Sequence, residues 1–219
     1  MARRATAVVL VLLALTVLCA LPAAAALQAK ITYSPYGTWG GELDVTSSLR
    51  SWGSTAPPAT PGASFVTFCA EYGQEIGNNE VVDIASIGDR VNGSGALLTP
   101  GAAYLFYRFS TQALGGYHYG GPFADRYADA DSLQYAIWDL MGYGHPRGWS
   151  PEADTWRQEA LNSGWTGTDG VRIMNLVNPV TRLGRQDTFV LTPEPGSIAL
   201  LACGAAGLLP LMRRRKKLA

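Results

Sequence analysis

Two apolar segments, one at each end of the chain, limit what these 219 residues can fold into. The first runs from Ala5 to Leu21, follows two arginines, and leads into small residues that end at Ala26. A basic start, a short apolar run and an Ala-x-Ala pattern are typical of a secretory signal peptide, which is cleaved on export. We therefore predict a signal peptide over residues 1–26 and a single exported domain over residues 27–192.

The second apolar segment, residues 197–212, lies between a Pro-Glu-Pro motif (Pro193, Glu194 and Pro195) and a basic cluster (Arg213, Arg214, Arg215, Lys216 and Lys217). Such a cluster is costly to translocate, so it stops the segment in the membrane with its basic end in the cytoplasm. The segment has 16 residues, fewer than the roughly 20 that span a bilayer comfortably. We expect residues 193–219 to form a transmembrane sorting tail that holds the protein temporarily.

The charge of the exported domain differs from that of the whole chain, which is zero. The leader and tail contain seven of the 17 basic residues and one of the 17 acidic residues, which leaves 10 against 16 and a net charge of −6. A mildly acidic domain without a basic stripe is a poor candidate for nucleic-acid binding. We expect no nucleic-acid partner.

Strand and helix patterns follow one another in blocks, which predicts an α+β domain with strands at both ends and a helical segment between them. Short alternating or β-branched runs predict strands, and apolar spacing with capping residues predicts helices. We expect strands at 28–33, 41–45, 64–70, 81–84, 171–177 and 188–191, and helices at 99–114, from Asp129 or Asp131 to Gly142, and at 152–161.

Cysteine usage singles out one residue of the exported domain. Cys19 lies in the leader and Cys203 in the tail, so Cys69 has no partner for a disulfide within the domain. Unpaired cysteines in exported proteins need an explanation. Gln134 also needs an explanation, because this polar residue lies at the edge of a predicted apolar helix face, one turn before Trp138. In the simplest interpretation Cys69 is a buried small hydrophobe and Gln134 bonds to a backbone group.

The residues around these two positions resemble a known pair of motifs. Phe68-Cys69-Ala70-Glu71 and the run from Leu133 to Trp138 are similar to the signatures of Cys-Gln thioester domains of bacterial surface proteins. The resemblance implies that the Cys69 thiol displaces ammonia from the Gln134 carboxamide. Phe68, Tyr135 and Trp138 would then exclude water, and Glu71 is a candidate to assist, although a salt bridge to Arg108 or Arg126 is an equal alternative.

The tail is similar to that of PEP-CTERM proteins, which implies processing by an exosortase in a Gram-negative envelope, often beside exopolysaccharide production. Three stretches of the middle also resemble ectodomains found with such tails, namely 102–107, 115–119 and 130–134. These resemblances imply a location at the cell surface or in the extracellular matrix, after an inner-membrane intermediate.

The expected function is therefore a non-enzymatic surface or matrix protein that attaches covalently to an amine or hydroxyl on a surface polymer. An inert structural or carbohydrate-binding matrix component with a buried free cysteine is the alternative. No cofactor or metal is expected, because His118 and His145 have no cysteine or carboxylate at ligand spacing. No catalytic residues are expected either, since no nucleophile, base and acid occur in a recognised order.

Overall fold

The computed structural model describes residues 27–37, 40–47 and 64–192. The signal peptide, the sorting motif and the C-terminal apolar segment predicted from the sequence lie outside these residues. No helix among the described residues combines the length and apolar character needed to cross a bilayer.

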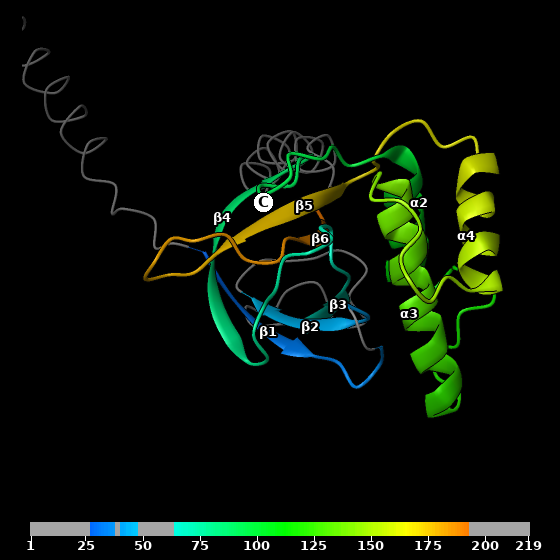
Figure 1. Cartoon of the computed structure of the whole chain (residues 1–219), viewed down its shortest axis with the longest axis horizontal. Helices are drawn as coiled ribbons and strands as arrows, with labels where there is room; N and C mark the ends of the chain where they lie inside the picture. The colour runs from blue at the N-terminus through cyan, green and yellow to red at the C-terminus, as the bar shows by residue number, and fades with distance from the viewer. Residues whose placement is uncertain (1–26, 38–39, 48–63, 193–219) are drawn as a thin grey trace, which may run out of the picture.

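Within the described residues, six strands form one sheet in which every neighbouring pair is antiparallel. The strands are β1 (Gln28–Tyr33), β2 (Leu43–Ser47), β3 (Ser64–Thr67), β4 (Glu80–Gly88), β5 (Val171–Val177) and β6 (Thr188–Leu191). Their order across the sheet is β3-β2-β1-β4-β5-β6 (Figure 1). The two C-terminal strands thus join the sheet that the N-terminal strands begin, as expected for a chain whose strands flank its helices.

The sheet curls until its two edge strands, β3 and β6, almost close a barrel. Just beyond β3, Cys69 forms an isolated bridge with Thr188, and the backbone N–H of Phe189 donates to the carbonyl of Phe68 at 3.2 Å. The Thr67 hydroxyl adds a bond to the Phe189 carbonyl at 2.7 Å. Edge strands expose unpaired backbone groups, and these contacts satisfy several of them next to Cys69.

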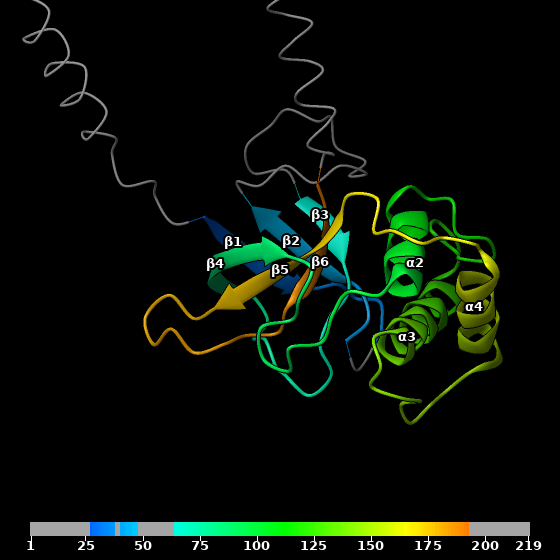
Figure 2. The ribbon, with the colours of Figure 1, turned by 90° about the horizontal axis from the view of Figure 1, so that it is seen from above.

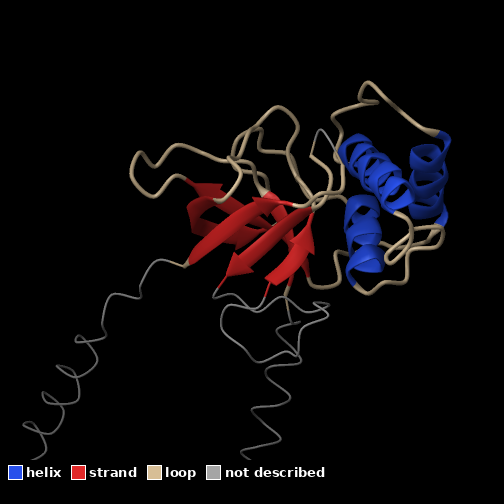
Figure 3. Cartoon of the chain, turned by 90° about the horizontal axis from the view of Figure 1, so that it is seen from below, coloured by secondary structure: helices blue, strands red, loops and turns tan. Residues whose placement is uncertain are grey.

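In the described part of the chain, three helices form a separate layer beside the sheet (Figure 3). They are α2 (Pro100–Ser110), α3 (Phe123–Leu140) and α4 (Pro151–Asn162). Thr99 and Ser150 cap α2 and α4 by accepting backbone N–H bonds, and each is followed by proline, the combination that favours a helix start. The prediction of an α+β domain is confirmed.

Among the described elements, α2 has its backbone closest to the strands, and α3 and α4 pack against α2 and against each other (Figure 2). The Phe106 ring stacks on Phe189 of β6 with centroids 5.2 Å apart. Phe109 meets Phe68 edge to face at 4.9 Å. These buried aromatic rings form an apolar junction between the two layers, and they place α2 against β6 and the end of β3.

Two predicted helix boundaries are wrong. Helix α3 begins at Phe123 rather than at Asp129 or Asp131, since Pro122 occupies its N-cap position without a side-chain bond. Asp129 instead accepts a hydrogen bond from the backbone N–H of His118 at 2.6 Å. Helix α2 ends at Ser110, four residues before the predicted Leu114, whose side chain is buried.

Candidate functional site

Cys69 and Gln134 lie side by side although 64 residues separate them in sequence. The backbone N–H of Cys69 donates to Gln134 Oε1 at 2.8 Å. Gln134 Nε2 donates in return to the carbonyl of Cys69, also at 2.8 Å. The carboxamide of Gln134 is therefore held at both ends by the backbone of the cysteine residue.

This pairing explains how a glutamine can be fully buried in the middle of α3. A buried amide without partners costs free energy, and here the end of β3 supplies one donor and one acceptor. The simplest sequence-based interpretation, a Gln134 bond to a backbone group, agrees with these contacts. The structure adds that the backbone group belongs to Cys69.

The thiol of Cys69 lies at the base of a covered site and is only 4% exposed. Burial raises the pKa of the Cys69 thiol to about 12, so the sulfur is protonated at neutral pH. Gly40 closes over it: a β-carbon at this position would lie 3.3 Å from Cys69 Sγ and 2.9 Å from the Trp138 ring. The positive φ of Gly40, 111°, also favours glycine there.

A cavity of about 850 Å³ begins at Cys69. Tyr135 and Trp138, predicted to shield the site, line this cavity together with Cys69. Phe68, predicted for the same role, is buried against Phe109 and is not among the described lining residues. The aromatic protection of the thiol thus comes from α3 rather than from the neighbouring residue of the strand.

Glu71 does not make the salt bridge to Arg108 or Arg126 that we considered. The chain bends after Cys69, and the Glu71 carboxylate instead accepts the backbone N–H of Ser94 at 2.7 Å. Its other oxygen, Oε2, is buried and has no hydrogen-bond partner among the described residues. Glu71 is also not among the described residues that line the cavity, so its position does not support a direct role at the thiol.

Burial raises the pKa of Glu71, the bond from Ser94 lowers it, and the Asp187 carboxylate raises it further. The net direction is upward, so the folded protein loses stability as pH rises from 4.5, the ordinary value of the group, through its raised pKa. Glu71→Gln removes this loss. We expect the free energy of unfolding of the variant, minus that of wild type, to increase with pH over this window in urea titrations.

The control for the loss of one carboxylate is Glu152→Gln, at an exposed position of α4. A Glu71→Gln difference that decreases with rising pH would mean that the folded state favours the charged form, contrary to its burial.

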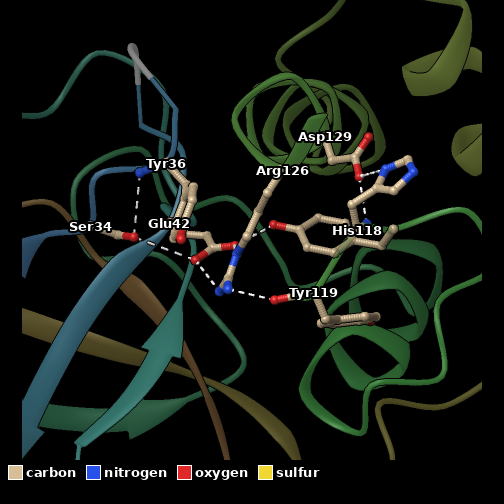
Figure 4. Close-up of polar contacts among 8 residues, drawn as sticks. Ser34, Tyr36, Glu42, His118, Tyr119, Arg126 and Asp129 are labelled. Atoms are coloured by element: carbon tan, nitrogen blue, oxygen red, sulfur yellow. Dashed lines mark hydrogen bonds and ion pairs between the residues drawn. The ribbon is translucent and has the colours of Figure 1, made fainter. Parts of the chain in front are cut away.

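A second buried cluster, which the sequence did not reveal, joins α3 to the start of β2. Arg126 Nη2 and Nε contact the two oxygens of Glu42 at 2.8 and 2.9 Å, and Tyr117 donates its hydroxyl to the same carboxylate. Figure 4 shows the Arg126 side chain extending to Glu42 and to the carbonyl of Tyr119, a bond of 2.6 Å. Glu42 is 2% exposed, so this is a buried, bidentate ion pair.

This cluster fixes the segment that covers the thiol. Glu42 follows Gly40 and Gly41 directly in the chain, and the Arg126 guanidinium lies 4.2 Å from the centre of the Tyr36 ring. Residues on both sides of the Gly40 turn are therefore attached to one arginine of α3. The only sequence signal was a glutamate within the alternating run predicted as a strand at 41–45, where a charged residue usually indicates an exposed position.

The two histidines each lie beside an aspartate. His118 Nδ1 is 2.8 Å from Asp129 Oδ2, and His145 Nδ1 is 3.1 Å from Asp139 Oδ1. Within the described ranges, no group of three or more histidine, cysteine, aspartate or glutamate side chains is placed to hold a metal ion. His118 serves instead to connect the glycine-rich 115–121 segment to α3.

No protein-family model, curated protein or solved structure matches this chain.

Proposed function

We propose that this is a non-enzymatic surface or matrix protein in which Cys69 and Gln134 form an internal thioester that attaches the protein covalently to a neighbouring polymer. The observation that carries the proposal is the pair of 2.8 Å hydrogen bonds between the Gln134 carboxamide and the Cys69 backbone. They hold the carbon that would be attacked next to the residue that bears the thiol.

The proposed reaction balances without a cofactor. Cys69 Sγ attacks Cδ of Gln134, the new C–S bond replaces the C–N bond, and Nε2 leaves as ammonia after taking up the thiol proton. Because burial raises the pKa of Cys69 to about 12, the proton must move as the bond forms rather than beforehand. The leaving nitrogen is itself the acceptor, so no carboxylate is required at the sulfur.

The backbone N–H of Cys69 has a specific role in this scheme. It already donates to Gln134 Oε1, the atom on which negative charge develops when sulfur adds to the carbonyl. A fixed donor at that oxygen stabilises the tetrahedral intermediate, as in an oxyanion hole. The same donor polarises the carbonyl of the finished thioester toward an incoming amine or hydroxyl.

The second step releases the cysteine. A nucleophile on the target attacks Cδ of Gln134, the C–S bond breaks, and the proton of the nucleophile passes to sulfur. An amine leaves an amide link, and a hydroxyl leaves an ester. The Cys69 thiol is restored, but ammonia has been lost, so the protein reacts once and is not an enzyme.

Delivery to the surface is the part of the proposal that rests on the sequence. A signal peptide, a Pro-Glu-Pro motif and a basic stop imply export, a membrane-held intermediate and processing by an exosortase-type enzyme. The covalent step would then take place in the envelope or matrix.

The alternative, a matrix protein in which Cys69 stays a free thiol, also has an observation in its favour. Both polar ends of Gln134 are satisfied by hydrogen bonds, which is what a purely structural buried amide requires. Intact mass distinguishes the two functions, since only the thioester loses ammonia.

The test uses protein produced from the full chain and purified after export. We expect wild type to be lighter than its processed sequence by one ammonia, and to gain one methylamine on incubation with that amine. Cys69→Ala and Gln134→Ala should each have their full sequence mass and no adduct. Gln158→Ala, which removes an exposed glutamine of α4, is the matched control and should behave as wild type.

A wild-type protein at full sequence mass, with one thiol that alkylates after unfolding, would exclude the thioester. An adduct that persists in Gln134→Ala would place the reactive carbonyl elsewhere.

A further inference from the structure

The cavity beside Cys69 is open on the side away from the thiol, and its rim has a distinct composition. Cys69 and Trp138 are almost completely buried at its base, whereas Tyr33 and Tyr72 are 51% and 55% exposed. The cavity volume of about 850 Å³ is in the range of pockets that enclose small ligands. It therefore extends well beyond what a thiol and a carboxamide need.

The two exposed tyrosines are held in place while their rings remain accessible. Tyr72 meets Trp138 edge to face, with centroids 5.0 Å apart and an angle of 82°. The Tyr33 hydroxyl donates to the carbonyl of Ile76, so its ring cannot turn freely. Fixed aromatic rings offer large apolar surfaces at low entropic cost.

Polar side chains line the same cavity as these rings. Gln74, Glu75 and Arg147 line the cavity and are exposed, and together they supply an amide, a carboxylate and a guanidinium. Glu75 and Arg147 have opposite charges, and Glu42, which also lines the cavity, is already paired with Arg126. The rim therefore offers hydrogen-bond donors and acceptors beside aromatic faces, without the cationic excess that a phosphate or acidic polymer would require.

We propose that this cavity binds a short, uncharged saccharide non-covalently, with sugar rings stacked on Tyr72 and Tyr33 and hydroxyls bonded to Gln74, Glu75 and Arg147. Sugars have apolar C–H faces and a periphery of hydroxyls, which matches this lining. A lipid chain would need a continuous apolar wall, and a basic peptide would need an acidic excess. The inference goes beyond the proposed thioester, because none of these contacts involves the thiol or the carboxamide.

The test uses full-chain protein carrying Cys69→Ala, which cannot form a thioester and so separates the two proposals. The probes are cellotetraose, maltotetraose and N-acetylated chitotetraose, measured by saturation-transfer NMR and by titration of tryptophan fluorescence. We expect at least one probe to bind at about 10 mM, a concentration that largely fills a site with a 1 mM dissociation constant.

Variants of Tyr72 identify the cavity as the binding site. Tyr72→Ala should weaken binding about tenfold or more, which corresponds to about 1.4 kcal/mol of lost stacking. Tyr72→Phe keeps the ring and should bind within about threefold of the parent. Phe123→Ala is the matched control, because Phe123 is 56% exposed and is not among the described lining residues; it should bind as the parent does.

Circular dichroism confirms that each variant is folded before its affinity is compared. Absence of binding by all three probes would overturn the proposal, as would equal affinity of Tyr72→Ala and the parent. Binding of a lysine-rich peptide at Tyr72 when no saccharide binds would also overturn it.

Discussion

Glu42→Ala is expected to lower the free energy of unfolding by about 3–5 kcal/mol, the usual cost of removing one partner of a buried ion pair. The carboxylate accepts bonds from Arg126 and Tyr117. Without this carboxylate, the partly buried Arg126 guanidinium beside Tyr36 loses its ion-pair partner. Urea denaturation of the variant and wild type measures the difference.

The double variant Glu42→Ala with Arg126→Met separates the charge from the packing. A buried pair replaced by apolar groups often costs little, so the double variant should recover at least half of the stability lost by Glu42→Ala. A double variant less stable than Glu42→Ala would mean that Arg126 acts through its other contacts, with Tyr119 and Tyr36, and not through the ion pair.

The same variant reports on the cover of the thiol. Glu42 is two residues from Gly40, which lies over Cys69 Sγ. If the Glu42 carboxylate and its partners hold Gly40 over the thiol, Glu42→Ala should speed alkylation of Cys69. The rate is measured in the Gln134→Ala background, where the thiol is free, and under conditions where the protein is still folded.

The order of strands and helices was predictable because each depends on local patterns. The runs at 28–33, 171–177 and 188–191 became β1, β5 and β6 with the expected bounds. Thr99 and Ser150 marked helix starts correctly because a capping side chain before proline acts over only three residues. The prediction of a cap at Asp129 or Asp131 was wrong for a related reason, since an aspartate that accepts a tertiary hydrogen bond, as Asp129 does, cannot be distinguished in sequence from a cap.

The curl of the sheet and the buried charges were not predictable from one sequence. β3 and β6 meet across more than 120 residues, and no local pattern encodes that distance. Glu42, Arg126 and Tyr117 come from three separate segments, and each alone resembles a surface or loop residue. The proximity of Cys69 and Gln134 was inferred only through a family resemblance, and the structure brings them together through backbone bonds that the resemblance did not specify.

Asp187 is the other residue whose loss should have a large effect, and it too was missed by sequence analysis. Its carboxylate is fully buried and accepts three bonds, from the backbone N–H groups of Asn92 and Leu176 at 2.6 and 2.9 Å and from Asn175 Nδ2 at 2.8 Å. Its own carbonyl accepts the N–H of Ala70. The residue thus connects β5, the loop at 92 and the segment next to Cys69.

Asp187→Ala removes the acceptor of three donors, of which the Leu176 N–H and the Asn175 amide belong to buried residues. A buried donor left without its acceptor costs about 1–3 kcal/mol. Burial raises the pKa of Asp187, which means that the charged side chain already costs the folded state something, and this offsets part of the loss. We expect a net decrease of about 3 kcal/mol in the free energy of unfolding at neutral pH. Asp89→Ala, at an exposed position just after β4, is the control.

Asp187→Asn distinguishes hydrogen bonding from charge. Asparagine keeps one acceptor oxygen but turns an NH2 group toward a donor. The free energy of unfolding of Asp187→Asn should therefore lie between that of wild type and that of Asp187→Ala. Because Thr188 bridges Cys69, Asp187→Ala should also speed alkylation of the thiol in the Gln134→Ala background. If stability falls but the alkylation rate does not change, then the closure between β3 and β6 does not depend on this carboxylate, and the bonds of Thr67 and Phe189 hold Cys69 in place.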